Sequence, residues 1–410
     1  MIRKILFSLF ISLMTLSASA YDFMADGIAS NEKNVADGLA PLSKEMEAEG
    51  SSEMEAARKK VALKGTQVTI DKIIYDVAGD TAIVYNGRSC TGAVTIPSTI
   101  TYSGKTYSVT TIGSSAFKGC TSLTSVAIPN SVTTIDNYAF RDCSSLASVT
   151  IPNSVTTIGS YAFDGCSSLA SVSIPNSVTT IDNEAFYGCS SLASVTIGNS
   201  VTKISSTAFN RCSSLKGFYV DSNNPNYCSV QGVLFSKDKT TLICYPNAKG
   251  AAYEIPNSVT TIGSSAFYRC TSLTSVTIPN SVTTIGNSVF SGCSSLTSVY
   301  CKIKKPLSIS SYTFRNVPFS SATLYVPKGC KQAYASANYW KDFGTITEMD
   351  FSIKGDVNED DVLNVSDVTS IINYLLGIET LPDFTKADLN DDFEINVSDV
   401  TALINLILAQ

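Results

Sequence analysis

The stretch Ser148-Val-Thr-Ile-Pro-Asn-Ser-Val-Thr-Thr-Ile-Gly-Ser-Tyr-Ala-Phe-Asp-Gly-Cys-Ser-Ser-Leu169 is one copy of a unit that recurs along the chain. Its Ile-Pro-Asn motif (Ile-Gly-Asn in one copy) recurs every 23 residues, skips once by 58, and then resumes: Ile128, Ile151, Ile174, Ile197, Ile255 and Ile278. A fixed period of this size, with apolar residues locked to it, is the signature of a solenoid. We therefore predict stacked repeats over residues 111–296.

Within the unit, the apolar residues define one buried side. Residues 148–151 alternate Ser and Thr with Val and Ile, which predicts a short strand with its aliphatic side chains inward. Because proline has no amide proton to donate, the strand ends at Pro152. We expect residues 155–158 to form a second extended side and residues 159–163 to open a helical turn. The unit thus predicts a solenoid of short β-strands and helical turns.

Phenylalanine and cysteine each recur at one position of the unit. The phenylalanines are Phe117, Phe140, Phe163, Phe186, Phe209, Phe267 and Phe290, and the cysteines are Cys120, Cys143, Cys166, Cys189, Cys212, Cys270 and Cys293. We interpret the phenylalanines as stacked core rather than an aromatic binding strip. The cysteines follow the repeat, which disulfide pairing does not require, so we predict free buried thiols. The state of five off-register cysteines stays open: Cys90, Cys228, Cys244, Cys301 and Cys330.

Composition narrows the classes of function. Only 16% of the 410 residues are charged, and the formal net charge is −6. No basic stripe is present, so nucleic acid is not an expected partner. The chain contains no histidine, which removes Ser-His-Asp chemistry and the commonest transition-metal ligand. Carboxylate chemistry remains open, and we predict that the protein is not an enzyme.

The N-terminal segment predicts export. Residues 1–20 have a basic start, an apolar run and a small-residue end, as in a secretory signal peptide; a retained membrane anchor is the less favoured alternative. Residues 21–66 are charged and poor in β-branched residues, which predicts a mobile leader. No later apolar run reaches the roughly 18 residues of a membrane span. We therefore expect a secreted or cell-surface protein without a membrane span after signal cleavage.

Three segments flank or interrupt the array. Residues 67–110 predict an N-terminal β cap, with strands at 68–70, 73–77 and 82–85. The long step contains an insertion at residues 216–250, with expected strands at 218–221, 232–235 and 241–245. Residues 297–350 predict a degenerate repeat and a C-terminal cap with a short helix at 331–337.

Residues 351–410 contain two acidic loops of the same pattern, 32 residues apart. Oxygen-bearing side chains stand at loop positions 1, 3, 5, 9 and 12, and a backbone carbonyl would serve position 7, as in calcium loops. The first loop offers Asp356, Asn358, Asp360, Val362, Asn364 and Asp367, and the second offers Asp388, Asn390, Asp392, Glu394, Asn396 and Asp399. An acidic turn that caps a helix is the alternative interpretation. The tandem repeat favours two Ca²⁺ sites.

These motifs resemble two known families. The unit, together with Val-Leu-Phe-Ser-Lys-Asp at 233–238 and Tyr-Val-Pro-Lys-Gly at 325–329, is similar over residues 67–350 to the BspA-like leucine-rich repeat family of bacterial surface or secreted proteins. This resemblance implies a curved leucine-rich-repeat solenoid with β-rich caps and, as in studied members, adhesion. The paired loops resemble a type I dockerin. That resemblance implies a small all-α, EF-hand-like domain that docks onto a cohesin when loaded with calcium.

The dockerin resemblance also implies roles for single residues. In that family, loop positions 10 and 11 help to choose the partner, which here are Val365, Ser366, Val397 and Ser398. Their near two-fold sameness implies two binding orientations. Loop position 6, normally glycine, holds Asp361 and Phe393. Phenylalanine tolerates a left-handed backbone poorly, so we expect the second site to be weaker or distorted.

We predict a binding or adhesion protein that recognises an unknown protein or glycan through residues 111–296 and a cohesin-type partner through residues 351–410. The alternative is a component of an extracellular polysaccharide-degrading assembly, through glycoside hydrolysis or carbohydrate binding. Hydrolysis needs two carboxylates in a cleft. Asp136 and Asp182 share a repeat position, but Gly159 lies between them on an open face, so we interpret them as solvated turn residues. Outward hydroxyl rows offer carbohydrate contacts, although a soluble β-surface is the simpler interpretation: Thr150, Ser173, Thr196 and Thr277.

Overall fold

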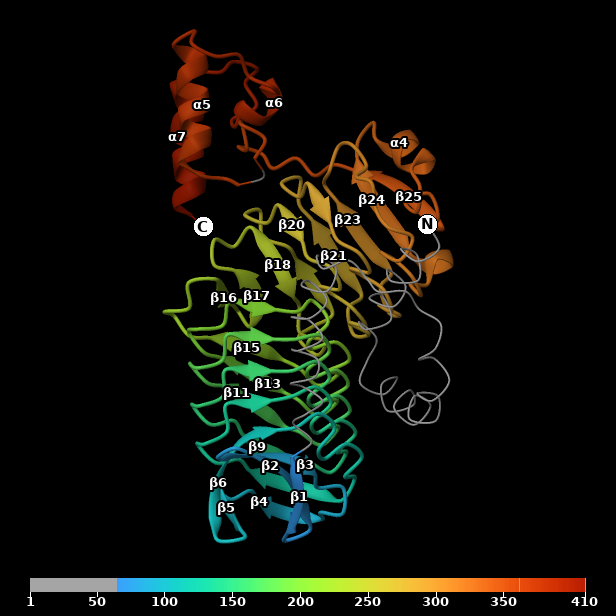
Figure 1. Ribbon diagram of the computed structural model, residues 1–410. Helices are drawn as coiled ribbons and strands as arrows, with labels where there is room; N and C mark the ends of the chain where they lie inside the picture. The colour runs from blue at the N-terminus through green and yellow to red at the C-terminus, as the bar shows by residue number, and fades with distance from the viewer. Residues whose placement is uncertain (1–64, 361, 410) are drawn as a thin grey trace, which may run out of the picture. The chain divides into compact units, whose positions relative to one another are not determined.

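The computed structural model describes residues 65–360 and 362–409 (Figure 1). The predicted signal peptide and the predicted leader up to residue 64 lie outside the described residues. Regular structure starts at Thr66, one residue before the expected cap. None of the helices in the described part of the chain combines the length and hydropathy needed to cross a bilayer.

The N-terminal end is a small β-structure that starts the stack. Its strands are β1 (Thr66–Ile70), β2 (Ile73–Ala78), β3 (Thr81–Asn86), β4 (Gly92–Thr95), β5 (Thr99–Tyr102) and β6 (Lys105–Ile112). Strands β1, β2 and β3 form an antiparallel meander, and β5 and β6 form a hairpin. Strand β3 then pairs in parallel with β6, which is the first rung of one ladder. The strands expected at 68–70, 73–77 and 82–85 are confirmed.

Two parallel ladders build the array. Their strands are β7 (Leu123–Ala127), β8 (Thr134–Ile135), β9 (Ser148–Thr150), β10 (Thr157–Ile158), β11 (Ser171–Ile174), β12 (Thr180–Ile181), β13 (Ser194–Ile197), β14 (Lys203–Ile204) and β15 (Gly217–Val220). The shorter strands pair in the order β6-β8-β10-β12-β14, and the longer ones form β4-β7-β9 and β11-β13-β15. Each residue pairs with its equivalent 23 positions on, as Thr157 does with Thr180. The predicted solenoid of 23-residue repeats is confirmed.

The third side of each repeat consists of successive tight turns. Cys166 N donates to Phe163 O three residues back, at 3.2 Å, while Phe163 N donates to Ala185 O of the next repeat, at 2.7 Å. Alternate amides thus serve the turn and the neighbouring repeat, so no α-helix forms at the expected helical turn. Tyr161 accordingly adopts a left-handed backbone, with φ of 59°.

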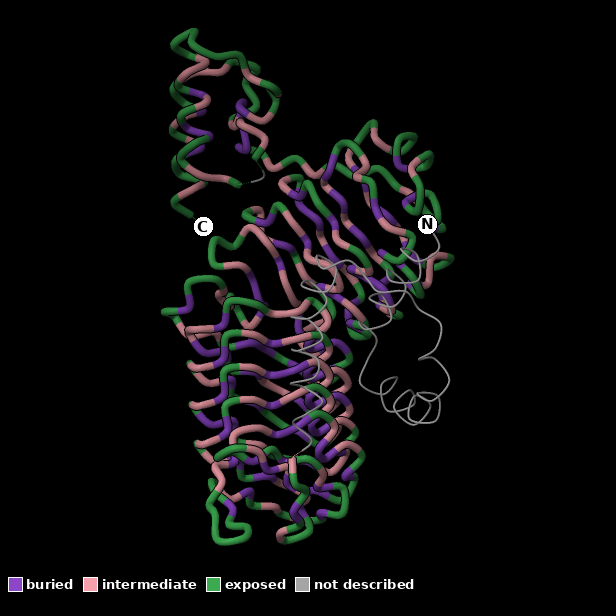
Figure 2. Tube along the Cα trace, viewed as in Figure 1, coloured by how far each residue is buried: buried purple, intermediate pink, exposed green. Residues whose placement is uncertain are grey.

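The core is a column of stacked rings and thiols. From Phe117 to Phe209, neighbouring phenylalanine rings lie 5.2–5.4 Å apart and nearly parallel. The cysteine of each repeat lies in this series of tight turns, and its thiol (here called a repeat thiol) donates to a carbonyl of the preceding turn of the solenoid, as Cys166 Sγ does to Phe140 O at 3.2 Å. Figure 2 shows the buried residues running from repeat to repeat. The phenylalanine column is confirmed as core, and no cysteine among the described residues forms a disulfide.

The insertion interrupts both ladders. Strands β16 (Tyr227–Val230), β17 (Val233–Ser236) and β18 (Thr241–Cys244) pair antiparallel, and β18 then pairs in parallel with β20 (Thr261–Ile262). The buried core divides here into two clusters, one ending near Phe218 and Leu234 and the other starting at Val233. The expected strands at 218–221 and 232–235 are present, each shifted by one residue as β15 and β17, and the one expected at 241–245 is present as β18, which ends one residue earlier. Strand β16 was not expected.

The array then resumes and closes. Its remaining strands are β19 (Ala252–Glu254), β21 (Ser275–Ile278), β22 (Thr284–Ile285), β23 (Ser298–Cys301), β24 (Thr323–Pro327) and β25 (Thr345–Met349). A 3-10 turn, η1 (Phe319–Ser321), and helix α4 (Lys331–Ser336) lie between the last strands. Trp340 is fully buried, and its indole N–H donates to Leu307 O at 2.8 Å. The short helix expected at 331–337 is present as α4.

The C-terminal part is helical and has a core of its own. It contains α5 (Val365–Leu375), α6 (Phe384–Ala387) and α7 (Val397–Leu408). Val357, Val368, Ile371, Ala387 and Leu403 are its buried apolar residues. This small all-α unit positions the two acidic loops.

Candidate metal centre and docking surface

The first acidic loop, residues 356–367, is held together by its carboxylates. Asp367 is fully buried; its Oδ1 accepts from Val357 N at 2.9 Å and its Oδ2 from Asn364 N at 2.8 Å. Asp360 N donates to Asp356 Oδ1 and to Asn358 Oδ1, both at 3.1 Å. The first and last carboxylates thus fix the loop from both ends.

The second loop, residues 388–399, repeats these contacts. Asp399 is fully buried and accepts from Leu389 N at 2.9 Å and from Asn396 N at 3.0 Å. Asp392 N donates to Asp388 Oδ1 at 3.1 Å. The loops therefore share one fold as well as one sequence pattern.

The residue types of both loops fit an oxygen-binding cation. Asp367 and Asp399 are buried carboxylates, and among the described residues neither forms an ion pair with a lysine or arginine. A buried carboxylate without a compensating charge is unfavourable, so a cation at each loop would be stabilising. Each loop adds side-chain and backbone oxygens in the order that calcium uses. Within the described part of the chain, however, no three His, Cys, Asp or Glu side chains gather into a metal cluster.

The same residues also begin the helices. Asn364 Oδ1 accepts from Ser366 N at 2.8 Å, and Asp367 completes a capping box at the start of α5. Asn396 and Asp399 form the equivalent capping box of α7. Position 9 and position 12 therefore have a structural role in capping as well as the right chemistry for a calcium ligand.

Loop position 6 differs between the loops. Phe393 has a φ of 66° and is 86% exposed, so its ring has no packing that offsets the left-handed backbone. Its amide donates to Asp388 Oδ2 at 2.9 Å. Asp361 lies outside the described residues.

The two helices expose apolar side chains that their small core does not use. Val365 is 70% and Val397 72% exposed, and Ser366 and Ser398 beside them are also exposed. Further along, two equivalent positions are apolar and exposed in both halves: Ile372 and the C-cap Leu376 in the first, and Ile404 and Leu408 in the second. Leu375 of α5 and Leu406 of α7 are exposed as well. Each α5 residue has its α7 equivalent 32 positions on. The four expected partner residues are thus the start of a larger exposed apolar surface. The sequence signal for this surface is that each helix has more apolar residues than one buried face needs.

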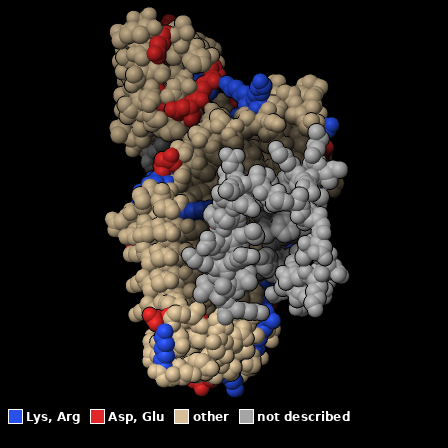
Figure 3. Space-filling view, viewed as in Figure 1, with Lys and Arg blue, Asp and Glu red and all other residues tan. Residues whose placement is uncertain are grey.

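On the solenoid, the outward positions of the longer strands form rows. Thr150, Ser173 and Thr196 are exposed, and Thr277 is half-buried. Tyr219 pairs in register with Thr196 and is 60% exposed. Figure 3 shows a solenoid surface with few charged side chains.

A second aromatic site follows in the row that contains Thr277. Tyr300 and Tyr325 pair in register on β23 and β24, and their rings stack at 4.5 Å. Three tyrosines of these rows were not expected from the sequence: Tyr219, Tyr300 and Tyr325. Each replaces the threonine of Ser-Val-Thr-Ile, so aligning the repeats with one another would identify them.

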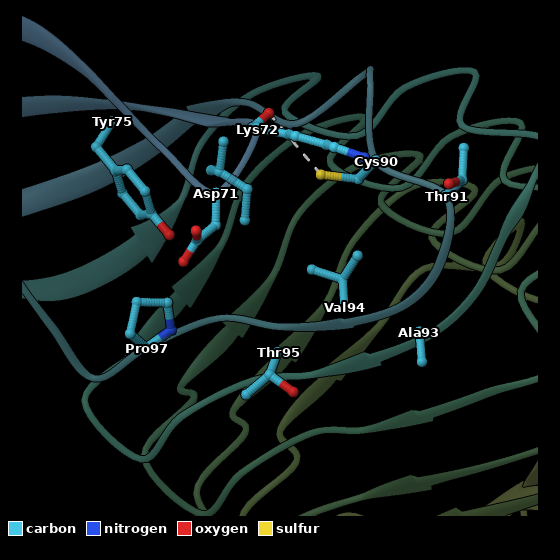
Figure 4. Close-up of a pocket in the computed structure, with 10 residues that line it drawn as sticks. Asp71, Lys72, Tyr75, Cys90, Thr91, Ala93, Val94, Thr95 and Pro97 are labelled. Carbon is cyan, nitrogen blue, oxygen red and sulfur yellow. Dashed lines mark hydrogen bonds between the residues drawn. The ribbon is translucent and has the colours of Figure 1, made fainter.

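One open cavity of about 340 Å³ lies at the N-terminal end, beside β2 and β4 (Figure 4). Cys90 and Tyr75 are among its lining residues. Burial raises the pKa of the Cys90 thiol and raises the pKa of Tyr75 to about 12. A thiol and a phenol with raised pKa values are poor nucleophiles, so neither Cys90 nor Tyr75 is an activated group in this cavity.

The repeats match a known family in sequence. The family described as BspA type leucine rich repeat region matches in six copies over residues 93–231 and 243–351, more than half of the chain. The chain belongs to the BspA-type leucine-rich repeat family. A dockerin type I domain matches residues 354–408, the part that contains both acidic loops. Both are non-catalytic families typical of extracellular or cell-surface binding proteins, and dockerin type I domains bind calcium and dock onto cohesins.

Solved structures of the same class are distant. The pneumococcal vaccine antigen PcpA is 22% identical, with 70% of this chain and 99% of that chain covered and a TM-score of 0.45. A leucine-rich repeat protein from Eubacterium ventriosum is 23% identical (69% and 85% covered, TM-score 0.45), and one from Bacteroides ovatus is 24% identical (70% and 89% covered, TM-score 0.41). No functionally curated protein matches the chain. Likenesses at this level say nothing about what this chain binds.

Proposed function

We propose that this is a secreted or cell-surface adhesion protein whose solenoid recognises a protein or glycan and whose calcium-loaded C-terminal domain docks onto a cohesin-type partner. The observation that carries the proposal is the repeated site: two loops with the same hydrogen bonds, each followed by a helix with the same exposed apolar residues.

Calcium has a defined place in this proposal. In the first loop it would be held by Asp356, Asn358, Asp360, Val362, Asn364 and Asp367, and in the second by Asp388, Asn390, Asp392, Glu394, Asn396 and Asp399. When bound, calcium would supply positive charge that offsets the repulsion among the loop carboxylates and so would fix the loops that precede α5 and α7. The side chains of this protein then present the apolar helix surface to the partner.

The docking surface is two-fold repeated, which supports docking in two orientations. Val365 and Ser366 stand at the start of α5 as Val397 and Ser398 stand at the start of α7. A partner that reads one set could read the other after a half-turn of the domain.

Surface plasmon resonance of the full chain on an immobilised type I cohesin tests the docking proposal. We expect capture in calcium and none in chelator. Because either helix can serve, Val365→Asp or Val397→Asp alone should weaken capture less than about tenfold, whereas the pair together should abolish it. Thr380→Asp, an exposed change in the segment after α5 and away from the docking surface, is the matched control. Capture that persists in chelator, or that survives the double change, contradicts the proposal.

Carbohydrate binding is the second candidate for the solenoid. The exposed Tyr219 and the stacked pair Tyr300 and Tyr325 lie in outward rows of hydroxyl side chains, a surface suited to a neutral, hydroxyl-rich ligand. A glycan array probed with the full chain and with Tyr300→Ala/Tyr325→Ala tests this candidate. Glycan signals that are equal for both chains would count against it.

A further inference from the structure

Two ion pairs join the calcium loops to each other in a reciprocal way. Lys354 Nζ lies 2.7 Å from Asp391 Oδ1, and Lys386 Nζ lies 3.5 Å from Glu359 Oε1. Each lysine stands two residues before the first ligand of its own loop, and each acid is position 4 of the other loop. The contacts therefore follow the same internal repeat that relates the two loops.

The acids occupy a demanding place in each loop. Asp391 lies between Asn390 and Asp392, two of the proposed calcium ligands, and Glu359 has the same place in the first loop. Both acids adopt a left-handed backbone, with φ of 60° and 59°. Such a conformation is held only where the surroundings impose it. A lysine that fixes the acid side chain from the other loop therefore helps to hold the turn between two calcium donors.

The two contacts differ in exposure. The Lys386 side chain is only 11% exposed and Glu359 28%, whereas Lys354 is 45% and Asp391 78% exposed. Solvent screens an ion pair less as its members are buried. The Lys386–Glu359 contact is therefore the stronger expected link, and Gly355 N adds a backbone bond to Lys386 O at 3.0 Å. The Glu359 carboxylate also pairs with Lys304, whose Nζ lies 2.7 Å from Oε2, and the Glu359 backbone carbonyl accepts from Asn280 Nδ2 at 3.2 Å.

We propose that these reciprocal ion pairs couple the two calcium loops, so that calcium in one loop raises the affinity of the other. Calcium in the first loop fixes Asp356 and with it Lys354, which holds Asp391 inside the second loop. Calcium in the second loop fixes Asp388 and with it Lys386, which holds Glu359 inside the first. Lys354 and Lys386 are positioning residues in this scheme, which rests on the calcium-dependent docking proposed above.

Calorimetric titration of calcium into the full chain measures this coupling. The affinity of the first loop is compared between the wild type and Asp388→Ala, in which the second loop is disabled. We expect the calcium affinity of the first loop to fall about fivefold in Asp388→Ala. This is at the low end of measured couplings because partly exposed ion pairs are weak. In a chain with Lys354→Gln and Lys386→Gln, the same Asp388→Ala change should alter the calcium affinity of the first loop less than about twofold.

Two further variants make the test specific. Lys304→Gln removes the other ion-pair partner of Glu359 and should leave the fivefold effect intact. In a chain that also carries Lys386→Gln, exchanging the charges of the remaining pair with Lys354→Asp and Asp391→Lys should restore the coupling that Lys354→Gln removes, which separates ion pairing from misfolding. Amide hydrogen exchange of α7 gives a second readout: calcium in the first loop should protect α7 in the wild type more than in the double lysine variant.

A fivefold effect that survives both lysine changes overturns the inference, as does a wild type whose loops bind independently. Cohesin capture distinguishes this failure from that of the proposed function. If the wild type captures a cohesin only with calcium but shows no coupling, the coupling alone is wrong. If it takes up no calcium at all, both proposals fail.

Discussion

At the scale of single residues, several loop side chains serve the fold and the candidate site together. Asn364 and Asn396 accept amide hydrogen bonds at the starts of α5 and α7 and also stand at a proposed calcium-ligand position. Asp367 and Asp399 close the capping boxes and are fully buried. Loss of either aspartate would therefore cost helix stability as well as a ligand, so a ligand variant needs a check of helix content.

Phe393 gives a residue-scale prediction. Its φ of 66° is costly for a side chain with a Cβ and suits glycine. Phe393→Gly should relieve about 1 kcal/mol of backbone strain in the ordered loop, which corresponds to roughly a fivefold gain in calcium affinity of the second loop. Phe393→Ala, which keeps a Cβ, is the matched control and should leave the affinity nearly unchanged. Calcium titration checks both, and an equal gain in both variants would show that the ring and not the backbone limits the site.

At the scale of elements, the stacked turns explain why cysteine recurs. Each repeat thiol is small enough for the core and donates to a carbonyl of the preceding turn of the solenoid, as Cys189 does to Phe163 O at 3.2 Å. Alanine would fill the site less well and lose the donor, and serine would bring a more polar group into the column. Hydroxyl side chains tie repeats in the same way at the surface, for example Thr179 Oγ1 to Thr156 O at 3.3 Å.

The thiols predict a pH dependence of stability. Burial raises the pKa of Cys166, Cys189, Cys212 and Cys270 above the usual value of a thiol, and that of Cys293 to about 12. The folded state keeps these thiols protonated, whereas the unfolded chain releases the protons near pH 8.5. Stability is therefore fully present below that pH and falls as the pH rises above it.

Urea unfolding between pH 7 and 10 checks the pH dependence, with the free energy of unfolding expected to fall steadily above about pH 8.5. Iodoacetamide labelling gives the control. The repeat thiols should resist labelling in the folded chain, and all of them should react after denaturation without reductant. Disulfide-linked repeat cysteines, or a free energy of unfolding that does not change between pH 7 and 10, would contradict this prediction.

At the scale of the molecule, the solenoid and the helical domain have separate cores and separate candidate binding surfaces. The solenoid core is continuous within each of two clusters that meet at the insertion. At this joint the end of one ladder is closed by a side chain, because Ile204 N donates to Tyr227 OH at 3.2 Å. The helical domain holds the acidic loops and a surface of exposed apolar residues, so the most specific chemistry lies outside the repeats.

Much of this arrangement follows from the sequence because the repeat fixes register. A residue such as Thr157 can meet only its equivalents in the neighbouring copies, so ladders, rings and thiols were predictable from spacing alone. Strand β16 was not, since it follows Asn-Asn-Pro-Asn at 223–226, which indicates a turn, and it is held as a strand by its antiparallel pairing with β17. The reciprocal lysine pairs were also beyond reach, because contacts between the two loops depend on how the helices fold together.

Calorimetric titration of calcium into the full chain, beside the variant with Asp356→Ala and Asp388→Ala, tests the central claim most directly. The account predicts uptake of about two calcium ions per wild-type chain, with the second loop the weaker, and loss of uptake in the double variant. The solenoid should stay folded in both, as judged by its thermal transition. A wild-type chain that takes up no calcium, or a double variant that binds as well as the wild type, would contradict it.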